Sequence, residues 1–401
     1  MQQVKFKKTE IGKIPEDWEE KRIGDEIELC YGKGLPEAKR IKGSISVYGS
    51  NGIVGFHNES LVDGPGIIIG RKGSVGEIKF SEKDFWTIDT TYYVKLLKKG
   101  DIKFWYYFLL TLKLNKMNSH SAVPGLNRDN VYEIIEKIPT SDEQRQITKI
   151  LSDLDSKIEL NQQMNKTLEA IGQAIFKHWF VDFEFPNEKG KPYKSSGGEM
   201  VDSKLGEIPK GWKVKPIDEI ANFLNGLALQ KYPAESEDKF LPVIKIRELK
   251  QGITDASDKA SIDIPKEYVI NDGDVLFSWS GSLEVVIWTF GKGALNQHLF
   301  KVSSKDYPKW FYYYWVLEHL EEYRHIAEGK ATTMGHIQRQ HLKDSLVLIP
   351  DKQTIIKMDK ILTPIIDKII QINVGSRSLS QIRDSLLPKL MSGKIRVPVE
   401  V

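Results

Sequence analysis

The chain has 401 residues, of which 40% are hydrophobic and 28% are charged, and its formal net charge is +3. This length predicts two or more domains, and the mild positive charge permits a nucleic-acid partner without arguing for one. No apolar run approaches the roughly 20 residues that cross a bilayer, the N-terminus lacks a signal-peptide core, and a single cysteine excludes an intramolecular disulfide or a multi-cysteine zinc site, so we expect a cytoplasmic protein.

The second half of the chain repeats the first more in its spacings than in its residues. Near the start stands Ile14-Pro15-Glu16-Asp17-Trp18, and its counterpart is Ile208-Pro209-Lys210-Gly211-Trp212. Each half then runs through a poorly matching stretch to an Ile-Pro pair, Ile138-Pro139 or Ile349-Pro350, which opens a long apolar-striped segment. Two similar frames with dissimilar inserts indicate a chain that contacts two different targets at a fixed separation.

The stretch from 19 to 138 holds short β-type runs, at 45–48, 66–69 and 91–94, punctuated by Gly, Asn and Asp. The stretch from 213 to 349 has similar runs, at 243–246, 275–277 and 299–302. Each stretch also contains an aromatic segment of helical type, 104–108 and 310–315. We therefore predict two α/β domains of about 130 residues each.

Steps of three and four predict a helix from Ser141 to about Phe180. Ser141 is expected to cap it, and Asp142 and Glu143 suit the positive end of the helix dipole. About 40 residues at about 1.5 Å each give a rod of roughly 60 Å. Its apolar stripe is Ile147, Leu151, Leu154, Ile158, Asn161, Met164, Leu168, Ile171 and Ile175.

Residues 187–204 are polar, rich in Gly, Ser and Lys and aperiodic, which predicts a linker. A second helix is predicted from about Lys352 to Met391. We expect it to kink or restart at Pro364, because an interior proline costs about 3 kcal/mol. Its stripe, in the same spacing as the first, is Met358, Leu362, Ile365, Ile369, Ile372, Gly375, Leu379, Ile382 and Leu386.

Both stripes are narrow, as in the seam of a coiled coil, and the phase of each slips once. Two such stripes in one chain most simply bury each other, and Asn161 on the seam is of the type that fixes register. The alternative is that each helix packs separately on its own domain. The residues expected to pair the helices are Leu151, Leu154, Ile158, Leu168, Leu362, Ile365, Ile369 and Leu379.

Motifs for catalysis are missing from the sequence. The run 66–74 fails the GxxxxGK[ST] spacing of a phosphate loop and is predicted to be a strand followed by a glycine turn. No Asn/Asp-Pro-Pro-aromatic motif of amino-methyltransferases, no H-E-x-x-H motif and no His/Cys cluster of metal-ligand spacing occurs. We therefore predict no catalytic residue, no metal site and no cofactor held by this chain.

Groups that read DNA recur at the same places in both halves. Loops 121–130 and 332–340 each follow the aromatic segment, and their Asn, Gln, Arg and His side chains can donate to base edges or grip phosphate. Segments 88–93 and 295–300 carry different polar groups at similar positions, and the glycine turns 70–74 and 279–282 could bring backbone to phosphates. The alternative is that these are ordinary polar loop and strand residues. The candidate DNA-binding residues are Arg71, Lys72, Ser74, Thr90, Thr91, Tyr92, Gly125, Asn127, Arg128, Ser280, Ser282, Asn296, Gln297, His298, His336, Gln338 and Arg339.

The arrangement resembles the specificity (S) subunit of Type I restriction–modification enzymes. The resemblance rests on the Ile-Pro-x-x-Trp opening of each half, on Ile138-Pro139 followed by Gln144, and on the helix endings at 174–183 and 385–395. It covers essentially the whole chain. The chain departs from the pattern at Gln353, which comes two residues earlier after its Ile-Pro pair, and at Pro364.

The resemblance implies an α/β (α+β) fold with pseudo-two-fold internal duplication, in which two globular target recognition domains are joined by two long antiparallel coiled-coil helices. The implied divisions are target recognition domain 1 at 1–140, spacer helix 1 at 141–186, a linker at 187–204, target recognition domain 2 at 205–350, and spacer helix 2 with the C-terminal tail at 351–401.

It further implies that each domain reads one half of a bipartite, asymmetric site, that the helices set the gap, and that the chain is not catalytic by itself. The implied partners are double-stranded DNA, two modification subunits docked on the helices, and restriction subunits, with no membrane. S-adenosylmethionine, ATP and Mg²⁺ are expected on those partner subunits.

Two other readings stay open from the residues alone. One is an enzyme, either a stand-alone methyltransferase or a nuclease, and the other is a coiled-coil scaffold that binds proteins only. Neither explains why the inserts diverge while their frames repeat.

Overall fold

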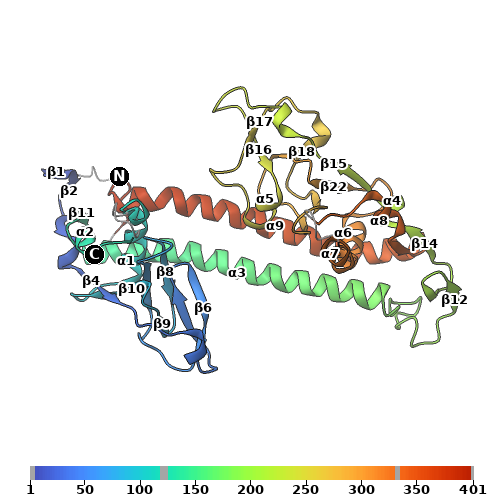
Figure 1. The fold of residues 1–401 in the computed structure, drawn as a ribbon, viewed down its shortest axis with the longest axis horizontal. Coiled ribbons are helices and arrows are strands. Elements are labelled where there is room, and N and C mark those ends of the chain that lie inside the picture. The colour runs from blue at the N-terminus through green and yellow to red at the C-terminus, as the bar shows by residue number, and fades with distance from the viewer. Residues whose placement is uncertain (1–4, 118–124, 330–334, 399–401) are drawn as a thin grey trace. The chain divides into compact units, whose positions relative to one another are not determined.

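The computed structural model describes residues 5–117, 125–329 and 335–398. The chain forms two compact units, one of residues 1–157 with 379–401 (unit 1) and one of residues 158–378 (unit 2). Two 40-residue helices, α3 (Ser141–Phe180) and α9 (Lys352–Met391), run from one unit into the other, and each unit carries one globular domain (Figure 1). Both helix spans agree with the predicted limits.

The first domain is dominated by strands. Its elements are β1 (Phe6–Thr9), β2 (Gly12–Pro15), β3 (Glu19–Arg22), β4 (Ile27–Tyr31), β5 (Ile45–Gly49), β6 (Gly52–His57), β7 (Gly66–Gly70), β8 (Ile78–Ser81), β9 (Phe85–Thr87), β10 (Thr91–Leu96), α1 (Ile102–Thr111), α2 (Arg128–Tyr132) and β11 (Ile135–Ile138). The central sheet has the order β4–β10–β7–β8, a second sheet has the order β6–β5–β9, and β11 pairs with β3. Helix α1 packs on β7 and β8 of the central sheet.

The second domain has more short elements. They are β12 (Met200–Ser203), β13 (Gly206–Pro209), β14 (Lys213–Pro216), α4 (Ile217–Ile220), β15 (Asn222–Asn225), β16 (Leu241–Ile244), α5 (Ile246–Gln251), β17 (Lys259–Ala260), β18 (Val269–Ile270), β19 (Val275–Ser278), β20 (Val285–Ile287), β21 (Gly293–Leu295), β22 (Leu299–Ser303), α6 (Lys309–Glu318), α7 (Leu320–Glu328), α8 (Arg339–Asp344) and β23 (Leu346–Ile349). Its sheets have the orders β15–β22–β19–β20 and β17–β16–β21–β18, and β14 pairs with β23.

The two domains repeat one topology. The sheet β4–β10–β7–β8 has the same order of chain elements as β15–β22–β19–β20, and the pair β11–β3 corresponds to β23–β14. The hairpin before each domain also repeats, because Thr9 Oγ1 donates to the carbonyl of Gly12 at 2.8 Å and Ser203 Oγ donates to that of Gly206 at 2.7 Å. The internal duplication predicted from the spacings is therefore confirmed.

The cores follow from alternation along the central strands. Ile27 and Leu29 of β4 and Ile67 and Ile69 of β7 point to one face, where they are fully buried with the aromatic side chains of α1. In unit 2 the aromatic helix α6 fills the same role. Trp18 is completely buried, so the Ile-Pro-x-x-Trp opening has a packing role.

The long helices run side by side and antiparallel in each unit (Figure 1). In unit 1, Arg383 of α9 donates to Asp155 of α3 at 2.7 Å. In unit 2, Asn161 Nδ2 donates to Ser376 Oγ at 2.9 Å and Asn165 Nδ2 donates to Asn373 Oδ1 at 2.5 Å. Position numbers on α9 fall as those on α3 rise, which is the signature of antiparallel pairing.

Most residues of the predicted seam are buried or partly buried. Leu151, Ile158, Leu362 and Ile369 are buried, and Leu154, Leu168, Ile365 and Leu379 are partly buried. Met164, Ile171 and Ile382 are instead exposed at 37%, 43% and 47%. On α3, Asn165 and Gly172 are buried next to the exposed Met164 and Ile171, so hydrophobicity alone could not locate the seam of this helix. The helices also pack into the domains, since Leu151 lies in the first core and Leu362 in the second.

Three local predictions are corrected. The cap of α3 is Thr140, whose hydroxyl accepts from the Glu143 amide at 3.4 Å, while Ser141 is already helical. Helix α9 continues through Pro364, which is exposed, so water can hydrate the carbonyl that the proline leaves without a donor. The predicted linker is ordered, because Tyr193 stacks on Phe185 at 4.6 Å.

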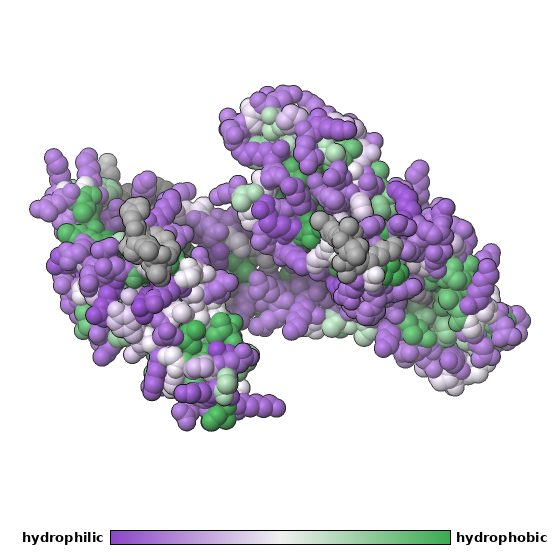
Figure 2. All heavy atoms as spheres, viewed as in Figure 1, coloured by the Kyte–Doolittle hydropathy of each residue, from purple (hydrophilic) through white to green (hydrophobic). Residues whose placement is uncertain are grey.

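Most of the drawn surface is hydrophilic, and hydrophobic residues gather where β6 lies in the first domain (Figure 2). The patch includes three side chains of β6, Ile53, Val54 and Phe56, which are exposed at 53%, 45% and 55%. The structure has no candidate membrane-spanning helix among the residues it describes.

Candidate nucleic-acid interface

Three segments that are far apart in the sequence meet in the first domain, at one end of the central sheet. The amides of Arg71 and Lys72 both donate to the carbonyl of Thr90, at 2.9 and 3.1 Å, and the Leu126 amide donates to the carbonyl of Arg71 at 2.9 Å. Lys72 also forms a β-bridge with Gly125. Main-chain bonds thus join the turn after β7, the turn before β10 and the loop before α2, and they bring the predicted residues of all three together.

Glycine makes this turn possible. A Cβ at Gly70 would lie 2.0 Å from the carbonyl oxygen of Ser74, and Gly73 has a φ of +77°, which side chains rarely adopt. The chain therefore reverses tightly enough to present Arg71 and Lys72 next to one another, with Ser74 closing the turn.

Two arginines of the first domain lie against an aromatic ring that the sequence analysis did not single out. The guanidinium carbons of Arg71 and Arg128 lie 4.9 and 5.1 Å from the ring centroid of Tyr31, and Arg71 Nη1 also donates to the carbonyl of Asp89 at 3.0 Å. Tyr31 is the last residue of β4 and is 50% exposed. Its ring is 5.1 Å from that of Tyr92. Burial raises the pKa of the Tyr92 phenol to about 12, with a smaller contribution from its hydrogen bond to Tyr31.

The second domain repeats this junction with different side chains. The Ile337 amide donates to the carbonyl of Trp279 at 2.9 Å, as Leu126 does to Arg71, and the Trp279 amide donates to the carbonyl of His298 at 3.3 Å. Ser280 forms a β-bridge with His336, as Lys72 does with Gly125. The turn after β19, the segment before β22 and the loop before α8 therefore meet in the same way.

Imidazole and indole rings take the place of the arginines here. Ser280 Oγ and His298 Nδ1 are 3.0 Å apart, and the Trp279 ring lies 5.8 Å from His298 and 6.4 Å from His336. The indole Nε1 of Trp279 donates to Asn225 Oδ1 at 2.9 Å and to the carbonyl of Gln297 at 3.2 Å. Trp279 was noticed in the sequence only as part of a turn, and Asn225 was not noticed at all.

Several predicted residues hold the frame and do not reach the surface. Thr91, Tyr92, Ser280 and Asn296 are buried, and their role as direct DNA contacts stays a prediction. Thr91 donates to the carbonyl of Ile88 at 2.7 Å, and Asn296 accepts from the His298 amide at 3.2 Å.

Other predicted residues are already engaged at helix ends or with neighbours. Asn127 caps α2 by accepting from the Asp129 amide at 2.8 Å, and Gln338 is the N-cap of α8. Arg339 donates to the carbonyl of Phe223 at 3.1 Å, and Ser282 accepts from Lys250 at 2.7 Å. Arg339 is thus not equivalent in its contacts to Arg128, although the two are the first residues of α8 and α2.

A sequence model described as the Type I restriction modification DNA specificity domain matches residues 15–170 and 209–378, which include both junctions. The chain belongs to this family. The Type I restriction enzyme MjaIX specificity subunit of Methanocaldococcus jannaschii is 26% identical over 429 residues, covering 98% of this chain and 97% of that one. The HindI specificity subunit of Haemophilus influenzae is 24% identical over 333 residues, covering 68% and 71% of the two chains.

A crystal structure of the S subunit from M. genitalium has the same fold. It is 16% identical in sequence, its TM-score is 0.60, and the match covers 93% of this chain and 96% of that one. The predicted family and the predicted fold of two domains joined by long helices are therefore confirmed.

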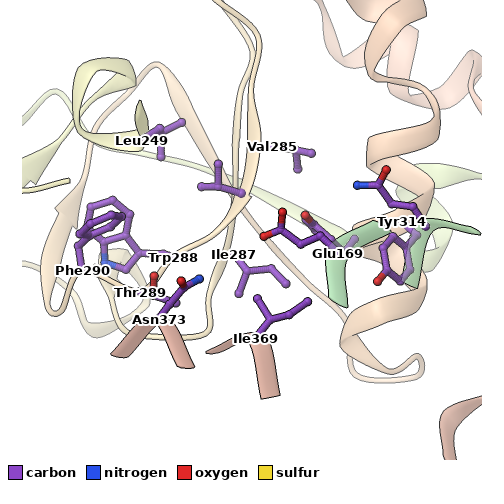
Figure 3. A pocket seen from close by; sticks show the side chains of 13 residues that line it. Glu169, Leu249, Val285, Ile287, Trp288, Thr289, Phe290, Tyr314, Ile369 and Asn373 are labelled. Carbon is purple, nitrogen blue, oxygen red and sulfur yellow. The ribbon is translucent and has the colours of Figure 1, made fainter. Parts of the chain in front are cut away.

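A cavity of about 300 Å³ lies in unit 2, between the second domain and the helix pair, and it does not have the make-up of an active site (Figure 3). Its lining is mostly apolar and aromatic, including Ile287, Trp288 and Ile369. Among the residues that the structure describes, Glu169 is the one carboxylate of the lining, and no His, Cys or Lys lines the cavity with it. Burial raises the pKa of the Glu169 carboxyl.

Proposed function

We propose that this chain is the DNA-reading subunit of a Type I restriction–modification complex and that each domain recognises one half of a bipartite, asymmetric site. One observation carries the proposal, namely that the same main-chain junction recurs in both domains with different side chains. A duplicated frame that served only packing would have no need for Arg71 and Lys72 in one copy and Trp279 and Ser280 in the other. Readout of two different half-sites requires such divergence, because base edges are distinguished by side-chain donors, acceptors and apolar groups.

The junctions have the chemistry that duplex DNA demands. In the first domain Lys72 is exposed and Arg71 and Arg128 are partly exposed, so three cations face one end of the sheet. Cations grip phosphates and guanine edges, and the accessible polar residues of the second domain, Gln297, His298 and His336, can exchange hydrogen bonds with bases. In this proposal Thr90, Gly125 and Ser74 shape the loops that carry these groups, and Ser282, Gln338 and Arg339 lie at the edge of the second reading surface.

The long helices serve as the spacer in this proposal. A continuous helix of 40 residues is about 60 Å long, and the pairing bonds in each unit resist sliding of one helix along the other. Two reading domains attached to such a pair would contact DNA at a set number of base pairs from one another. The chain itself has no catalytic role, and S-adenosylmethionine, ATP and Mg²⁺ would be bound by partner subunits.

An exposed stripe on α3 suits the docking of a modification subunit. Leu160, Met164 and Ile171 are 49%, 37% and 43% exposed, and their spacing puts them on one side of the helix. Contiguous exposed apolar side chains of this kind mark protein interfaces. Two modification subunits and the restriction subunits would complete the complex, which would act in the cytoplasm.

The proposal is tested by co-expressing the chain with its modification subunit and sequencing the methylated bases of the host genome. A methylated, gapped motif is expected, and duplexes with either half scrambled should bind the purified complex more weakly. Methylation without a gapped motif, or by the chain alone with labelled S-adenosylmethionine, would contradict the proposal. Exchanging Leu160 and Met164 together for glutamate should abolish co-purification of the modification subunit. The control variant exchanges the neighbouring exposed residues Glu159 and Gln163 together for lysine, and it should still co-purify with that subunit.

A further inference from the structure

The register of the central sheets gives a residue-by-residue match between the two reading surfaces. In the first domain Tyr31 of β4 pairs with Tyr92 of β10, which pairs with Ile69 of β7. In the second domain Asn225 of β15 pairs with Phe300 of β22, which pairs with Phe277 of β19. The three paired residues of each domain lie on the core-facing side of the sheet, and the first of them, Tyr31 or Asn225, is the last residue of its strand. Tyr31 and Asn225 therefore hold the same place in the two folds.

A second match follows from the turn that leaves the sheet. Arg71 comes two residues after Ile69, and Trp279 comes two residues after Phe277. The carbonyl oxygens of Arg71 and Trp279 each accept from the loop before the next short helix, at 2.9 Å in both domains. Arg71 beside Tyr31 thus corresponds to Trp279 beside Asn225, and these two pairs differ completely in chemistry.

The pair in the first domain is built to hold guanidinium groups in place. Tyr31 offers an exposed ring to Arg71 and Arg128 at about equal distances, 4.9 and 5.1 Å. Arg71 is fixed further by its bond to the carbonyl of Asp89. A guanidinium that rests on a ring keeps its N–H edge pointing outward, and a planar fork held this way suits bidentate hydrogen bonds.

The pair in the second domain presents no such fork. The indole Nε1 of Trp279 donates to Asn225 and to the carbonyl of Gln297. Arg339 lies outside this pair: it donates to the carbonyl of Phe223, and its guanidinium carbon lies 5.6 Å from the ring of Phe300. An indole ring with its N–H engaged offers an apolar face, and apolar groups distinguish bases mainly through the thymine methyl group.

We infer that Tyr31 is a specificity-determining positioning residue, which orients Arg71 and Arg128 so that one of them donates bidentately to a guanine of the first half-site. The inference rests on the proposed function. Guanine follows from the chemistry of the fork, because its O6 and N7 are the pair of major-groove acceptors that an arginine matches. At the place of Arg71 the second domain has the indole of Trp279, so no guanidinium reads a guanine from that position.

A phosphate contact is the main alternative role for these arginines, and it has a different signature. Loss of a phosphate contact weakens binding to all sequences about equally, whereas loss of a bidentate base contact changes the preference at one base pair. The measurement must therefore report base preference at each position, in addition to affinity.

The test uses the complex of the full chain with its modification subunit and selects binders from a pool of random duplexes. The wild-type complex should enrich a gapped motif with a G·C pair in one half. Arg71→Lys or Arg128→Lys keeps the charge and removes the fork, and at least one of the two should reduce the guanine preference at that position by about 10- to 100-fold. Tyr31→Leu should cause the same loss, and Tyr31→Phe, which keeps the ring, should preserve the preference.

The second half of the motif is the internal control for folding. Every variant should keep the wild-type base preferences in this half of the motif, because the residues that read it lie in the second domain. Arg145→Ala, which removes an exposed arginine of unit 1 paired with Asp142, is the matched control and should leave the whole motif unchanged.

The outcomes separate this inference from the proposed function. A gapped motif that keeps its guanine preference in Tyr31→Leu, or in both lysine variants, would overturn the inference alone. So would a motif without a guanine in the half that the Tyr31 and arginine variants affect. A wild-type complex that enriches no gapped motif would overturn both.

Discussion

Replacing Arg396 with alanine is expected to destabilise unit 1 because it leaves a buried carboxylate without its cation. Arg396 Nε and Nη2 donate to the two oxygens of Glu143 at 2.7 and 2.8 Å, and the Glu143 side chain is fully buried. Trp18 Nε1 also donates to Glu143, at 2.7 Å, and would be its remaining partner in this cluster. The C-terminal tail, the start of α3 and the Ile-Pro-x-x-Trp opening are thus tied together at one carboxylate.

The magnitude follows from what is left behind. Removing one partner of a buried ion pair typically costs about 3–5 kcal/mol. Arg396 keeps 23% of its side chain exposed, so water can reach part of the gap, and we expect a loss of about 2–4 kcal/mol in the free energy of unfolding of unit 1. The bond from Arg396 to Asp17 at 2.6 Å lies nearer to solvent and adds at most about 1 kcal/mol.

Hydrogen exchange read by mass spectrometry suits this test, since a chain of two units need not unfold in one step. Faster exchange is expected in peptides around Trp18 and Glu143, with peptides of unit 2 unchanged. Adding Glu143→Gln to the alanine variant should recover part of the loss, because the buried charge is then gone. Equal protection of these peptides in wild type and Arg396→Ala would refute the reasoning.

Acid should weaken the same cluster. Burial raises the pKa of the Asp17 carboxyl, but the hydrogen bond from Arg396, a main-chain hydrogen bond and the charges of Arg396 and Lys7 together outweigh burial and lower the pKa below 3.8. The contribution of this bond is present above pH 3.8 and is lost as the pH falls through the lower folded pKa. The part of the Arg396→Ala effect that comes from Asp17 should accordingly disappear in strong acid.

Three further changes test the packing of unit 2. Gly172→Ala would put a methyl carbon 1.9 Å from the hydroxyl of buried Tyr314 and should destabilise the unit by about 1–3 kcal/mol, measured by urea unfolding. Gly375→Ala is its matched control, because no neighbouring atom lies within 4 Å of the added carbon, and it should stabilise α9 by about 0.5–1 kcal/mol. If both variants destabilise the unit, lack of space for the methyl group is not the cause of the loss in Gly172→Ala. Arg377→Ala should destabilise the unit at neutral pH but not in strong acid, because the bond from Arg377 holds the pKa of Asp272 below 3.8; an effect that persists unchanged in acid would contradict this account.

The long helices could be predicted from the sequence because their signal is local. A period of three to four residues over 40 positions leaves few alternatives, and both spans agree with the structure. The seam of α3 was predicted less well because Asn165 and Gly172 take the place of hydrophobic side chains in it. Asn165 Nδ2 donates to Asn373 Oδ1 across the pair, and no hydropathy pattern in one helix reveals a partner on the other.

The reading surfaces show the same limit at longer range. The turn 70–74 and the loop before α2 could be singled out because glycine spacing and repeated Arg128 and Arg339 are visible in the sequence. Tyr31 could not, because its importance comes from the pairing of β4 with β10 and from two arginines that are distant in sequence. Only the sheet register brings these groups together.

Divergence of the two reading surfaces has a low structural cost, since the frame is held by the main chain. The amides of Arg71 and Lys72 and the carbonyl of Arg71 make the bonds that join the three segments, and Trp279 uses the same atoms in the second domain. A side chain at such a position can change from guanidinium to indole without removing a bond of the frame. Core positions change under a tighter constraint, because every change of volume there, as between the matched Ile69 and Phe277, must be met by packed neighbours. A duplicated fold of this design can therefore acquire two specificities by substitution at a few turn and strand-end positions, and those are the positions where the two domains differ most in chemistry.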